Sequence, residues 1–232
     1  MSHLLSLATG YEIARVVLPT FAESLVREID RDEADARLAL FARRVIARTR
    51  IQLHVEGRDR VPGDRAFVYM SNHQSHMDIP VLYAALPARS LRMVGKKELF
   101  RIPFWSRALR AGGFIEIDRS NRASAIASLD RAAAEIRDGI SVWIAPEGHR
   151  SRTGSLGPLK KGGFHLAKDT GTPIVPVAIH GTFEILPPGT INMAYDRSVR
   201  VVIGAPIPVE ERTIPSLMNE VEAFLQANVY RG

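Results

Sequence analysis

The chain contains no cysteine and no long uninterrupted apolar run. The absence of cysteine excludes disulfides, thiolate catalysis and cysteine-ligated zinc, and it suits a reducing compartment. A membrane-spanning helix needs about 18 or more consecutive apolar residues, so none is expected. The first residues lack a basic segment followed by an apolar core, so a secretory signal peptide is not expected either. Internal repeats and low-complexity segments are also missing.

The chain does have enough length and apolar content to build a proper core. It has 232 residues, of which 46% are hydrophobic, so one large domain is expected. Its net charge is +6 and its pI is about 10.0. A basic protein favours anionic partners, namely nucleic acid, phosphorylated metabolites or an anionic membrane surface. No recognised nucleic-acid reader motif or aromatic-interleaved basic strip is present, which argues against nucleic acid.

The first fifty residues differ from the remainder. Residues 11–29 and 33–49 both read as helices. In the second, four apolar residues recur at helical spacing: Leu38, Phe41, Val45 and Ile46. Arginines occupy much of the remaining surface: Arg37, Arg43, Arg44 and Arg48. Such a helix can lie on an anionic bilayer with its arginines at headgroup level. Alternatively, it packs on the domain and exposes a solvated arginine face.

From residue 51 onward, short apolar runs alternate with helical patterns. The runs cover 51–55, 66–71, 91–95, 114–117, 141–145, 174–179 and 199–203. The helical patterns cover 79–86, 98–110, 121–138 and 213–229. This alternation predicts an α/β domain with a central, mostly parallel or mixed sheet flanked by helices. We therefore divide the chain into an N-terminal amphipathic, membrane-associating helical segment (1–50) and an α/β domain (51–232).

The most informative segment is NHQSHMD, residues 72–78, which follows a predicted buried strand. His73 and Asp78 are a base and a carboxylate that can orient it. They meet only if the segment turns between them, because residues five apart lie on different sides of a helix or strand. A second interpretation makes Asp78 the N-cap of a helix starting near Pro80, with His73 as an ordinary loop residue. The spacing leaves both interpretations open.

Charged residues follow several of the other predicted strands. The cations are Lys96, Lys97, Arg119, Arg150, Lys160 and Lys161. In an open α/β sheet, ligands bind at the carboxyl ends of strands, and clustered Arg and Lys suit a phosphate group. Each cation taken alone also fits a solvated surface charge. Glu147, between Pro146 and Gly148, can accept hydrogen bonds from substrate hydroxyls or orient Arg150, or else form an exposed ion pair with it.

Four segments in order resemble the glycerolipid acyltransferase family, especially the 1-acyl-sn-glycerol-3-phosphate acyltransferases. They are NHQSHMD (family pattern NHxxxxD), GGFIEIDR at 112–119, PEGHRS at 146–151 (usually PEGTRS) and IVPVAI at 174–179. KKEL at 96–99 and LKKGGF at 159–164 also match the family. The resemblance covers roughly residues 66–180. The main departures are His149, where the family commonly has threonine, and His76, at a variable position where an aromatic residue is common.

The resemblance implies a mechanism and a set of site residues. His73 is the general base on the sn-2 hydroxyl of 1-acyl-sn-glycerol 3-phosphate, Asp78 holds its imidazole, and attack on an acyl thioester gives phosphatidic acid. Backbone amides near the first block are candidates to stabilise the oxyanion. Four residues would bind the glycerol phosphate: Arg119, Glu147, Gly148 and Arg150. Lys96 or Lys97 would add a phosphate contact, and Val175-Pro176 would shape the acyl region.

The resemblance also implies the partners. The acyl donor is acyl-CoA or acyl-carrier protein, the acceptor is a lysophospholipid, and no metal or other cofactor is needed. Both substrates are amphiphilic, which favours peripheral or monotopic attachment to the cytoplasmic face of the cell membrane. Sister O-acyltransferases acting on glycerol 3-phosphate, another lysophospholipid or an aminolipid share the same motifs. A metallohydrolase using His73, His76 and Asp78 is a remoter alternative, since no second cluster completes a metal shell.

Overall fold

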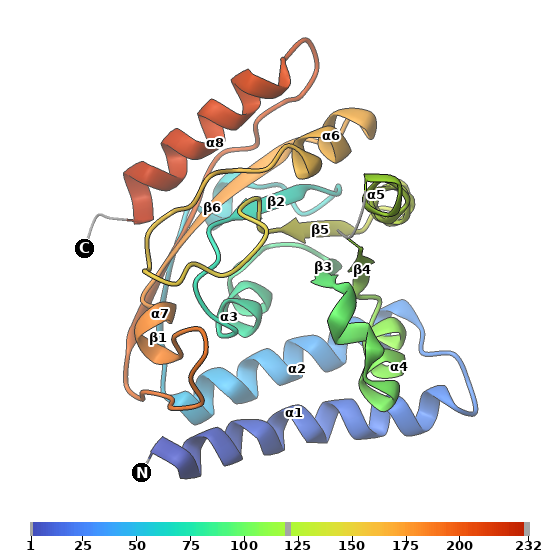
Figure 1. Ribbon diagram of the computed structural model, residues 1–232, viewed down its shortest axis with the longest axis vertical. Coiled ribbons are helices and arrows are strands. Elements are labelled where there is room, and N and C mark those ends of the chain that lie inside the picture. Colours follow the sequence, from blue (N-terminus) through green and yellow to red (C-terminus); the bar gives the residue numbers. More distant parts are fainter. Residues whose placement is uncertain (1, 119–121, 230–232) are drawn as a thin grey trace.

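The computed structural model describes residues 2–118 and 122–229, which form an α/β fold around a seven-stranded sheet (Figure 1). The strands are β1 (Gln52–Glu56), β2 (Val68–Ser71), β3 (Leu91–Lys96), β4 (Ile115–Ile117), β5 (Ser141–Ile144), β6 (Ile174–His180) and β7 (Ser198–Ile203). Their order across the sheet is β1-β7-β6-β2-β5-β3-β4. Each strand coincides with one of the predicted apolar runs to within two residues at either end.

The sheet is mixed, as the sequence predicts. β2 lies at the centre and pairs in parallel with both β5 and β6. β3 and β4 continue the parallel order beyond β5. β7 runs antiparallel to β6, and β1 pairs in parallel with β7. Five strands, β2 to β6, therefore point the same way, and their carboxyl ends meet along one edge of the sheet.

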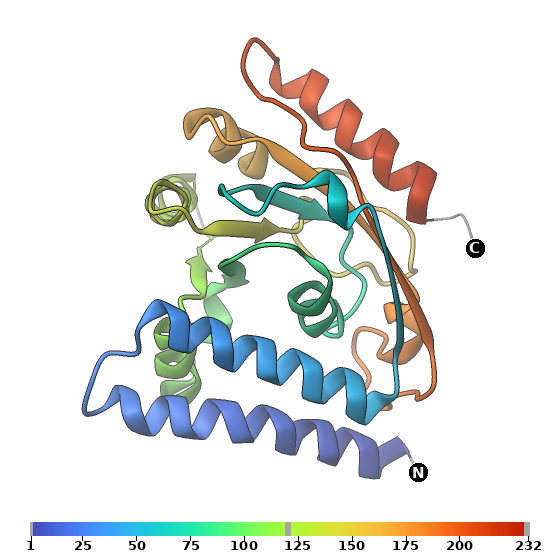
Figure 2. The same cartoon turned by 180° about the vertical axis from the view of Figure 1, so that it is seen from behind.

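Helices cover both faces of the sheet (Figures 1 and 2). They are α1 (Ser2–Ser24), α2 (Arg31–Thr49), α3 (Asp78–Ala85), α4 (Pro103–Ala111), α5 (Arg122–Arg137), α6 (Gly162–Asp169), α7 (Thr182–Ile185) and α8 (Ile214–Val229). Two 3-10 helices, η1 (Arg58–Arg60) and η2 (Lys97–Arg101), complete the regular elements. α5, α6 and α8 lie on one face, while α3 lies on the other with α2 and then α1 outside it.

Two hydrophobic clusters fill the spaces between these layers. Because the inner strands are covered on both sides, β2 and β5 are buried along their whole length. On one face Val68 and Met70 pack with residues of α5, α6 and α8. On the other face Tyr69 and Trp143 pack with residues of α2 and α3.

The helix predicted at 33–49 forms as α2. The Asp30 side chain caps it by accepting a hydrogen bond from the backbone of Glu33 at 2.8 Å. Val45 is buried in the core, and the carboxylate of Asp35 forms an ion pair with the buried Arg92 of β3. α2 is therefore fastened to the α/β domain by both apolar and ionic contacts.

α1 spans residues 2–24, so it starts and ends earlier than the predicted 11–29. It packs along α2 and α4 (Figure 2). None of the helices among the described residues has the length and apolarity needed to cross a bilayer. Membrane association of segment 1–50 stays a prediction.

Candidate active site

The residues singled out in the sequence gather at the carboxyl ends of the parallel strands. The NHQSHMD segment follows β2, Lys96 ends β3 and the PEGHRS segment follows β5. Thr182, which the sequence did not single out, follows β6. These strands are neighbours in the order β6-β2-β5-β3. The sheet thus brings together residues that lie up to about a hundred positions apart in the chain, at the place where open α/β sheets bind ligands.

His73 and Asp78 are in direct contact. Nδ1 of His73 lies 2.6 Å from Oδ2 of Asp78. The same oxygen accepts the backbone N–H groups of Gln74 at 2.8 Å and Ser75 at 3.0 Å. Because this oxygen acts as an acceptor, Nδ1 of His73 carries the proton and Nε2 is left as the basic nitrogen.

The carboxylate of Asp78 is fully buried, and both of its oxygens accept hydrogen bonds. Its other oxygen, Oδ1, accepts from the hydroxyl of Thr182 at 2.5 Å. Asp78 is the first residue of α3, and Met77 is the N-cap. The N-cap prediction for Asp78 is therefore wrong, because its carboxylate turns back to the amides that precede the helix. The segment makes the turn that the base–carboxylate interpretation requires.

Trp143 of β5 fixes the other side of His73. The two rings meet edge to face, with their centroids 5.3 Å apart at 85°. The indole N–H donates to the hydroxyl of Ser71 at 2.9 Å, which holds the indole in place. The His73 side chain is 17% exposed. Most of the imidazole is therefore enclosed, and His73 lines the cavity described below.

The segment IVPVAI also supports the loop that carries His73. The side-chain amide of Asn72 donates to the carbonyl of Ile179 at 2.8 Å and accepts from its N–H at 2.8 Å. Val175 is buried in the core next to β2. Neither Val175 nor Pro176 lines the large apolar cavity described below. Their role in shaping the acyl region stays a prediction.

Glu147 forms a hydrogen bond with the backbone of the segment that carries His73. Its Oε1 accepts the backbone N–H of His73 at 2.9 Å, and its Oε2 accepts that of Gly157 at 2.8 Å. The residue is 1% exposed, and burial raises the pKa of its carboxyl. The neighbouring Gly148 adopts a positive φ of 79°, which turns the chain after Glu147. The structure gives Glu147 a positioning role, and contact of Glu147 or Gly148 with substrate stays a prediction.

The backbone amides of the first block are largely occupied. Besides those of His73, Gln74 and Ser75, the amide of Met77 donates to the Ser75 hydroxyl and that of Asp78 to the Ser75 carbonyl. These five amides stabilise the loop itself. The expectation that the first block supplies oxyanion donors is therefore not supported for these five positions.

Cations differ in their access to the site. Arg150 lines the cavity beside His73, and desolvation lowers the pKa of its guanidinium. Lys96 also lines the cavity and is exposed. Nζ of Lys97, by contrast, forms an ion pair with Asp118 at 2.6 Å. Of the two lysines, Lys96 is therefore the one that lines the cavity. Arg119 lies outside the described residues.

A cavity of about 670 Å³ extends from His73 toward the N-terminal helices. Its volume lies within the range of small-molecule sites. Most of its wall is apolar, and the wall includes Val16 and Val17 of α1, Leu38 and Phe41 of α2, and Trp105 and Leu109 of α4. The charged and titratable groups, His73, His76, Lys96 and Arg150, belong to the end of the cavity formed by the strand ends, while Arg37 comes from α2. The cavity thus combines the His73 side chain at one end with a space suited to a hydrocarbon chain.

His76 lies at the edge of this cavity and is exposed on its outer side. Desolvation by the wall, together with the charge of Arg150, lowers its pKa to about 4. His76 is therefore neutral at neutral pH. Within residues 2–118 and 122–229, no three histidine or carboxylate side chains are grouped so as to hold a metal ion.

The sequence analysis did not single out Thr182 or Trp143. Thr182 directly follows a predicted strand, and the rule that binding residues follow strands applied to it as much as to Lys96. Trp143 lies inside a predicted strand, where nothing in the local pattern distinguishes it from a core residue.

Comparison with known proteins gives a consistent result. The model of the acyltransferase family matches residues 52–180. A chloroplast 1-acyl-sn-glycerol-3-phosphate acyltransferase of Brassica napus is 37% identical over 154 residues, which are 66% of this chain and 44% of the relative. The enzyme of the same name from Haemophilus influenzae is 37% identical over 128 residues, 53% of each chain. This chain spans about half the length of the curated relatives it matches.

A solved structure is similar over nearly the whole chain. The crystal structure of the 1-acyl-sn-glycerophosphate acyltransferase from Thermotoga maritima superposes with a TM-score of 0.81 at 26% identity. The match covers 97% of this chain and 93% of that one. The similarity therefore includes the helices that precede the segment matched by the family model.

Proposed function

Because the chain belongs to the acyltransferase family, we propose that it transfers a fatty acyl group from an acyl thioester to the sn-2 hydroxyl of 1-acyl-sn-glycerol 3-phosphate. The product is phosphatidic acid, a precursor of phospholipids. The observation that carries the proposal is the His73–Asp78 pair at the polar end of an apolar cavity. This arrangement puts a base beside a space for a hydrocarbon chain.

The chemistry follows from the orientation of His73. Nε2 of His73 takes the proton of the acceptor hydroxyl while the hydroxyl oxygen attacks the thioester carbonyl carbon. Asp78 holds the Nδ1–H tautomer and stabilises the imidazolium that forms. The tetrahedral intermediate collapses, the carbon–sulfur bond breaks, and the leaving thiolate receives the proton from Nε2. The new ester and the free thiol are the products, and His73 returns to its starting state.

In this proposal, cationic side chains at the same end of the cavity bind the phosphate of the acceptor. Arg150 and Lys96 both line the wall there. Arg150 offers two parallel N–H donors, and Lys96 offers a point charge. Their position favours an acceptor that carries a phosphate near its reacting hydroxyl. Arg119 completes this group by resemblance to the second family motif.

Helix α1 supports membrane attachment, since it carries apolar side chains on two sides. Val16 and Val17 line the cavity, whereas Leu18 is 54% exposed and Tyr11 is 57% exposed. Immediately after the helix, Leu25 is 57% exposed. A helix with an outward apolar side and a basic neighbour lies stably at a bilayer interface. Because the donor is a cytoplasmic thioester, attachment belongs on the cytoplasmic face of the membrane.

An assay with defined substrates tests the proposal. Purified protein is given acyl-CoA or acylated carrier protein together with one acceptor at a time, and products are identified by mass spectrometry. The acceptors are 1-acyl-sn-glycerol 3-phosphate, glycerol 3-phosphate, a lysophospholipid with a larger headgroup and an aminolipid. The proposal predicts the fastest turnover with the first acceptor. Faster turnover with another acceptor would assign the chain to a sister O-acyltransferase activity.

A further inference from the structure

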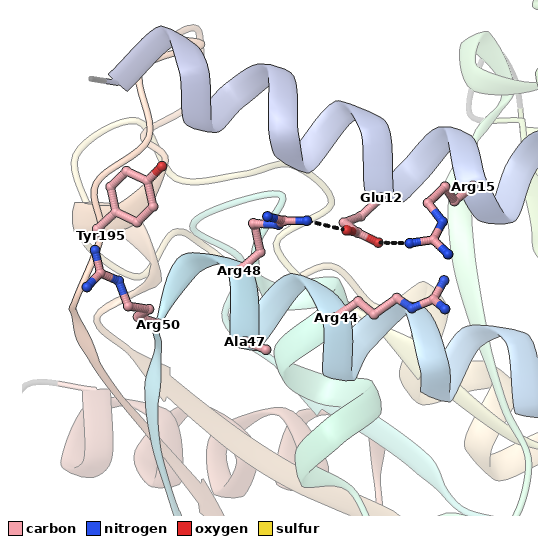
Figure 3. A pocket seen from close by; sticks show the side chains of 7 residues that line it. All are labelled: Glu12, Arg15, Arg44, Ala47, Arg48, Arg50 and Tyr195. Carbon is pink, nitrogen blue, oxygen red and sulfur yellow. Dashed lines mark hydrogen bonds and ion pairs between the residues drawn. The ribbon is translucent and has the colours of Figure 1, made fainter.

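A second pocket, of about 650 Å³, opens between α1 and α2 (Figure 3). It is lined by Glu12, Arg15, Arg44, Ala47, Arg48, Arg50 and Tyr195. The side chains come from α1, from α2 and its C-cap, and from the segment before β7. None of these residues lines the catalytic cavity. The proposed acyl transfer gives this pocket no role.

Glu12 organises two of the arginines. Its side chain is 4% exposed, and Oε1 accepts a hydrogen bond from Nη2 of Arg48 at 3.0 Å. Nη1 of Arg15 approaches its other oxygen at 3.9 Å. Figure 3 shows the two guanidinium groups on either side of this carboxylate. A buried carboxylate therefore holds Arg48 by a hydrogen bond, and the charge of Arg15 lies close to its second oxygen, which has no hydrogen-bond partner among the described residues.

The remaining cations leave the pocket with an excess of positive charge. Arg50 stacks over the Tyr195 ring at 5.6 Å and reaches Asp196 at 3.3 Å. Arg44 makes no ion pair with any residue that the structure describes. Arg44 and Arg48 lie four residues apart on α2, a spacing at which like charges repel. Four arginines thus face two carboxylates, Glu12 and Asp196, and a dianion would balance the difference.

A phosphate monoester matches this requirement. It carries a charge of about −1.5 to −2 at neutral pH and has three strong acceptor oxygens. One guanidinium group can donate two parallel hydrogen bonds to two such oxygens, which makes it more specific for phosphate than the point charge of lysine. We propose that this pocket is a second lipid site, which binds the phosphate-monoester headgroup of an anionic glycerophospholipid in the membrane. The proposal rests on the membrane attachment proposed above and adds a binding site separate from the catalytic centre.

The apolar surface of α1 favours a lipid over a free anion or a nucleic acid. Tyr11 is exposed on the helix that carries Glu12 and Arg15, and Arg15 lies over its ring at 5.5 Å. Leu18 follows two turns later on the same helix and is also exposed. A headgroup in the pocket would leave its acyl chains next to these side chains. Tyrosine is enriched at this level of membrane interfaces.

Vesicle partitioning tests the proposal with a matched pair of variants. The full chain is mixed with phosphatidylcholine vesicles that contain either phosphatidic acid or phosphatidylglycerol, with the contents adjusted to equal surface potential. Arg44→Gln removes a pocket cation. Arg43→Gln is the control, because Arg43 is exposed on the same helix, carries the same charge and does not line the pocket.

The expected readout is the ratio of the two partition coefficients. The parent protein should prefer phosphatidic acid by about tenfold, the value of one or two charge-assisted hydrogen bonds. Arg43→Gln should weaken both partitions equally and keep the ratio, since it removes only long-range attraction. Arg44→Gln should bring the ratio close to one. Equal effects of the two variants on the ratio would overturn the proposal.

Two further arms separate the lipid from other ligands. Inorganic phosphate and a short-chain, water-soluble phosphatidic acid are each tested for raising the thermal unfolding midpoint of the parent protein and of Arg44→Gln. A lipid site predicts that the phosphatidic acid gives the larger shift and that Arg44→Gln reduces it. Equal shifts with inorganic phosphate would overturn the lipid assignment. Turnover of Arg44→Gln on detergent-solubilised acceptor should equal that of the parent. If the parent protein itself shows no turnover, that result contradicts the proposed function but not the proposed lipid site.

Discussion

The hydroxyl of Thr182 donates a 2.5 Å hydrogen bond to Oδ1 of Asp78, while Oδ2 of the same carboxylate faces Nδ1 of His73. Thr182 and Asp78 are both fully buried and lie 104 positions apart in the chain. The carboxylate that contacts His73 is therefore itself held by a residue that follows a different strand, β6. Thr182 acts through Asp78 and is a positioning residue.

Replacing Thr182 by valine should lower kcat about tenfold or more and leave KM for the acceptor nearly unchanged. The variant keeps the side-chain shape but leaves Oδ1 of Asp78 without this partner, at a cost of about 1.5–3 kcal/mol. Steady-state kinetics with the preferred acceptor measure both constants. Thr182→Ser retains the hydroxyl and should restore most of kcat. A serine variant as slow as the valine variant would contradict the positioning role.

Glu147 predicts a specific pH dependence of stability. Burial raises the pKa of its carboxyl above the ordinary value of 4.5, because the charged form is poorly solvated. The folded state then holds the proton more tightly than the unfolded state does. Its contribution to stability is fully present below pH 4.5, and it falls as the pH rises through the folded-state pKa.

Glu147→Gln removes this titration, so the unfolding free energy of the parent minus that of the variant should fall as the pH rises above 4.5. Denaturant unfolding of both proteins at several pH values measures the difference. The amide offers only one oxygen, so the backbone N–H of His73 or Gly157 also loses an acceptor. A difference that rises with pH would show that the carboxylate is stabilised, not penalised, by its burial.

Lys96 and Lys97 should respond differently to the same substitution. Lys96→Gln should raise KM for the phosphate-bearing acceptor about tenfold, since Lys96 lines the cavity. Lys97→Gln breaks the ion pair with Asp118 and should change this KM less than twofold. Measuring both variants with an acceptor that lacks the phosphate provides the control, because neither should then differ from the parent. A larger KM effect at Lys97 would reverse the assignment.

The outward apolar side of α1 should be needed for vesicle binding. Leu18→Glu should reduce partitioning about tenfold or more, from the loss of roughly 1.5–3 kcal/mol of apolar burial. Ala227→Glu adds the same charge at an exposed site on α8, at the opposite edge of the molecule (Figure 1), and should have little effect. A point variant is preferable to deleting residues 1–50, because Val45 belongs to the core and Asp35 pairs with Arg92. Equal partitioning of both variants would exclude α1 as the attachment surface.

The arrangement of strands and helices was predictable because apolar runs of strand length alternate with helical patterns. The boundaries of helices were less predictable where two sequence signals compete. The pattern at 98–110 forms η2 and then α4, because Pro103 begins a new helix. At α1, the apolar residues Leu25 and Val26 continue the helical pattern beyond the end of the helix, and they are exposed.

The site was predictable where its residues are close in sequence. His73 and Asp78 were found because one turn joins them. The distant partners are Thr182, which follows β6 and contacts Asp78, and Trp143 of β5, which contacts His73. They depend on which strands are neighbours, and a single sequence does not contain the strand order. The choice between Lys96 and Lys97 likewise depended on Asp118, which follows β4. Glu147 was recognised as a candidate functional residue from the sequence. Its positioning role became clear only from the hydrogen bond that the backbone N–H of His73 donates to its carboxylate.

The most direct test of the central claim is acyl transfer by the parent protein, His73→Ala and Asp78→Asn under identical conditions. Each protein is given an acyl thioester and 1-acyl-sn-glycerol 3-phosphate, and phosphatidic acid and free thiol are quantified together. The parent should form both in equal amounts. His73→Ala should react about 10²–10⁴-fold more slowly than the parent and keep the parent's unfolding midpoint. Asp78→Asn should also react more slowly than the parent. Near-parental turnover by folded His73→Ala would contradict the account.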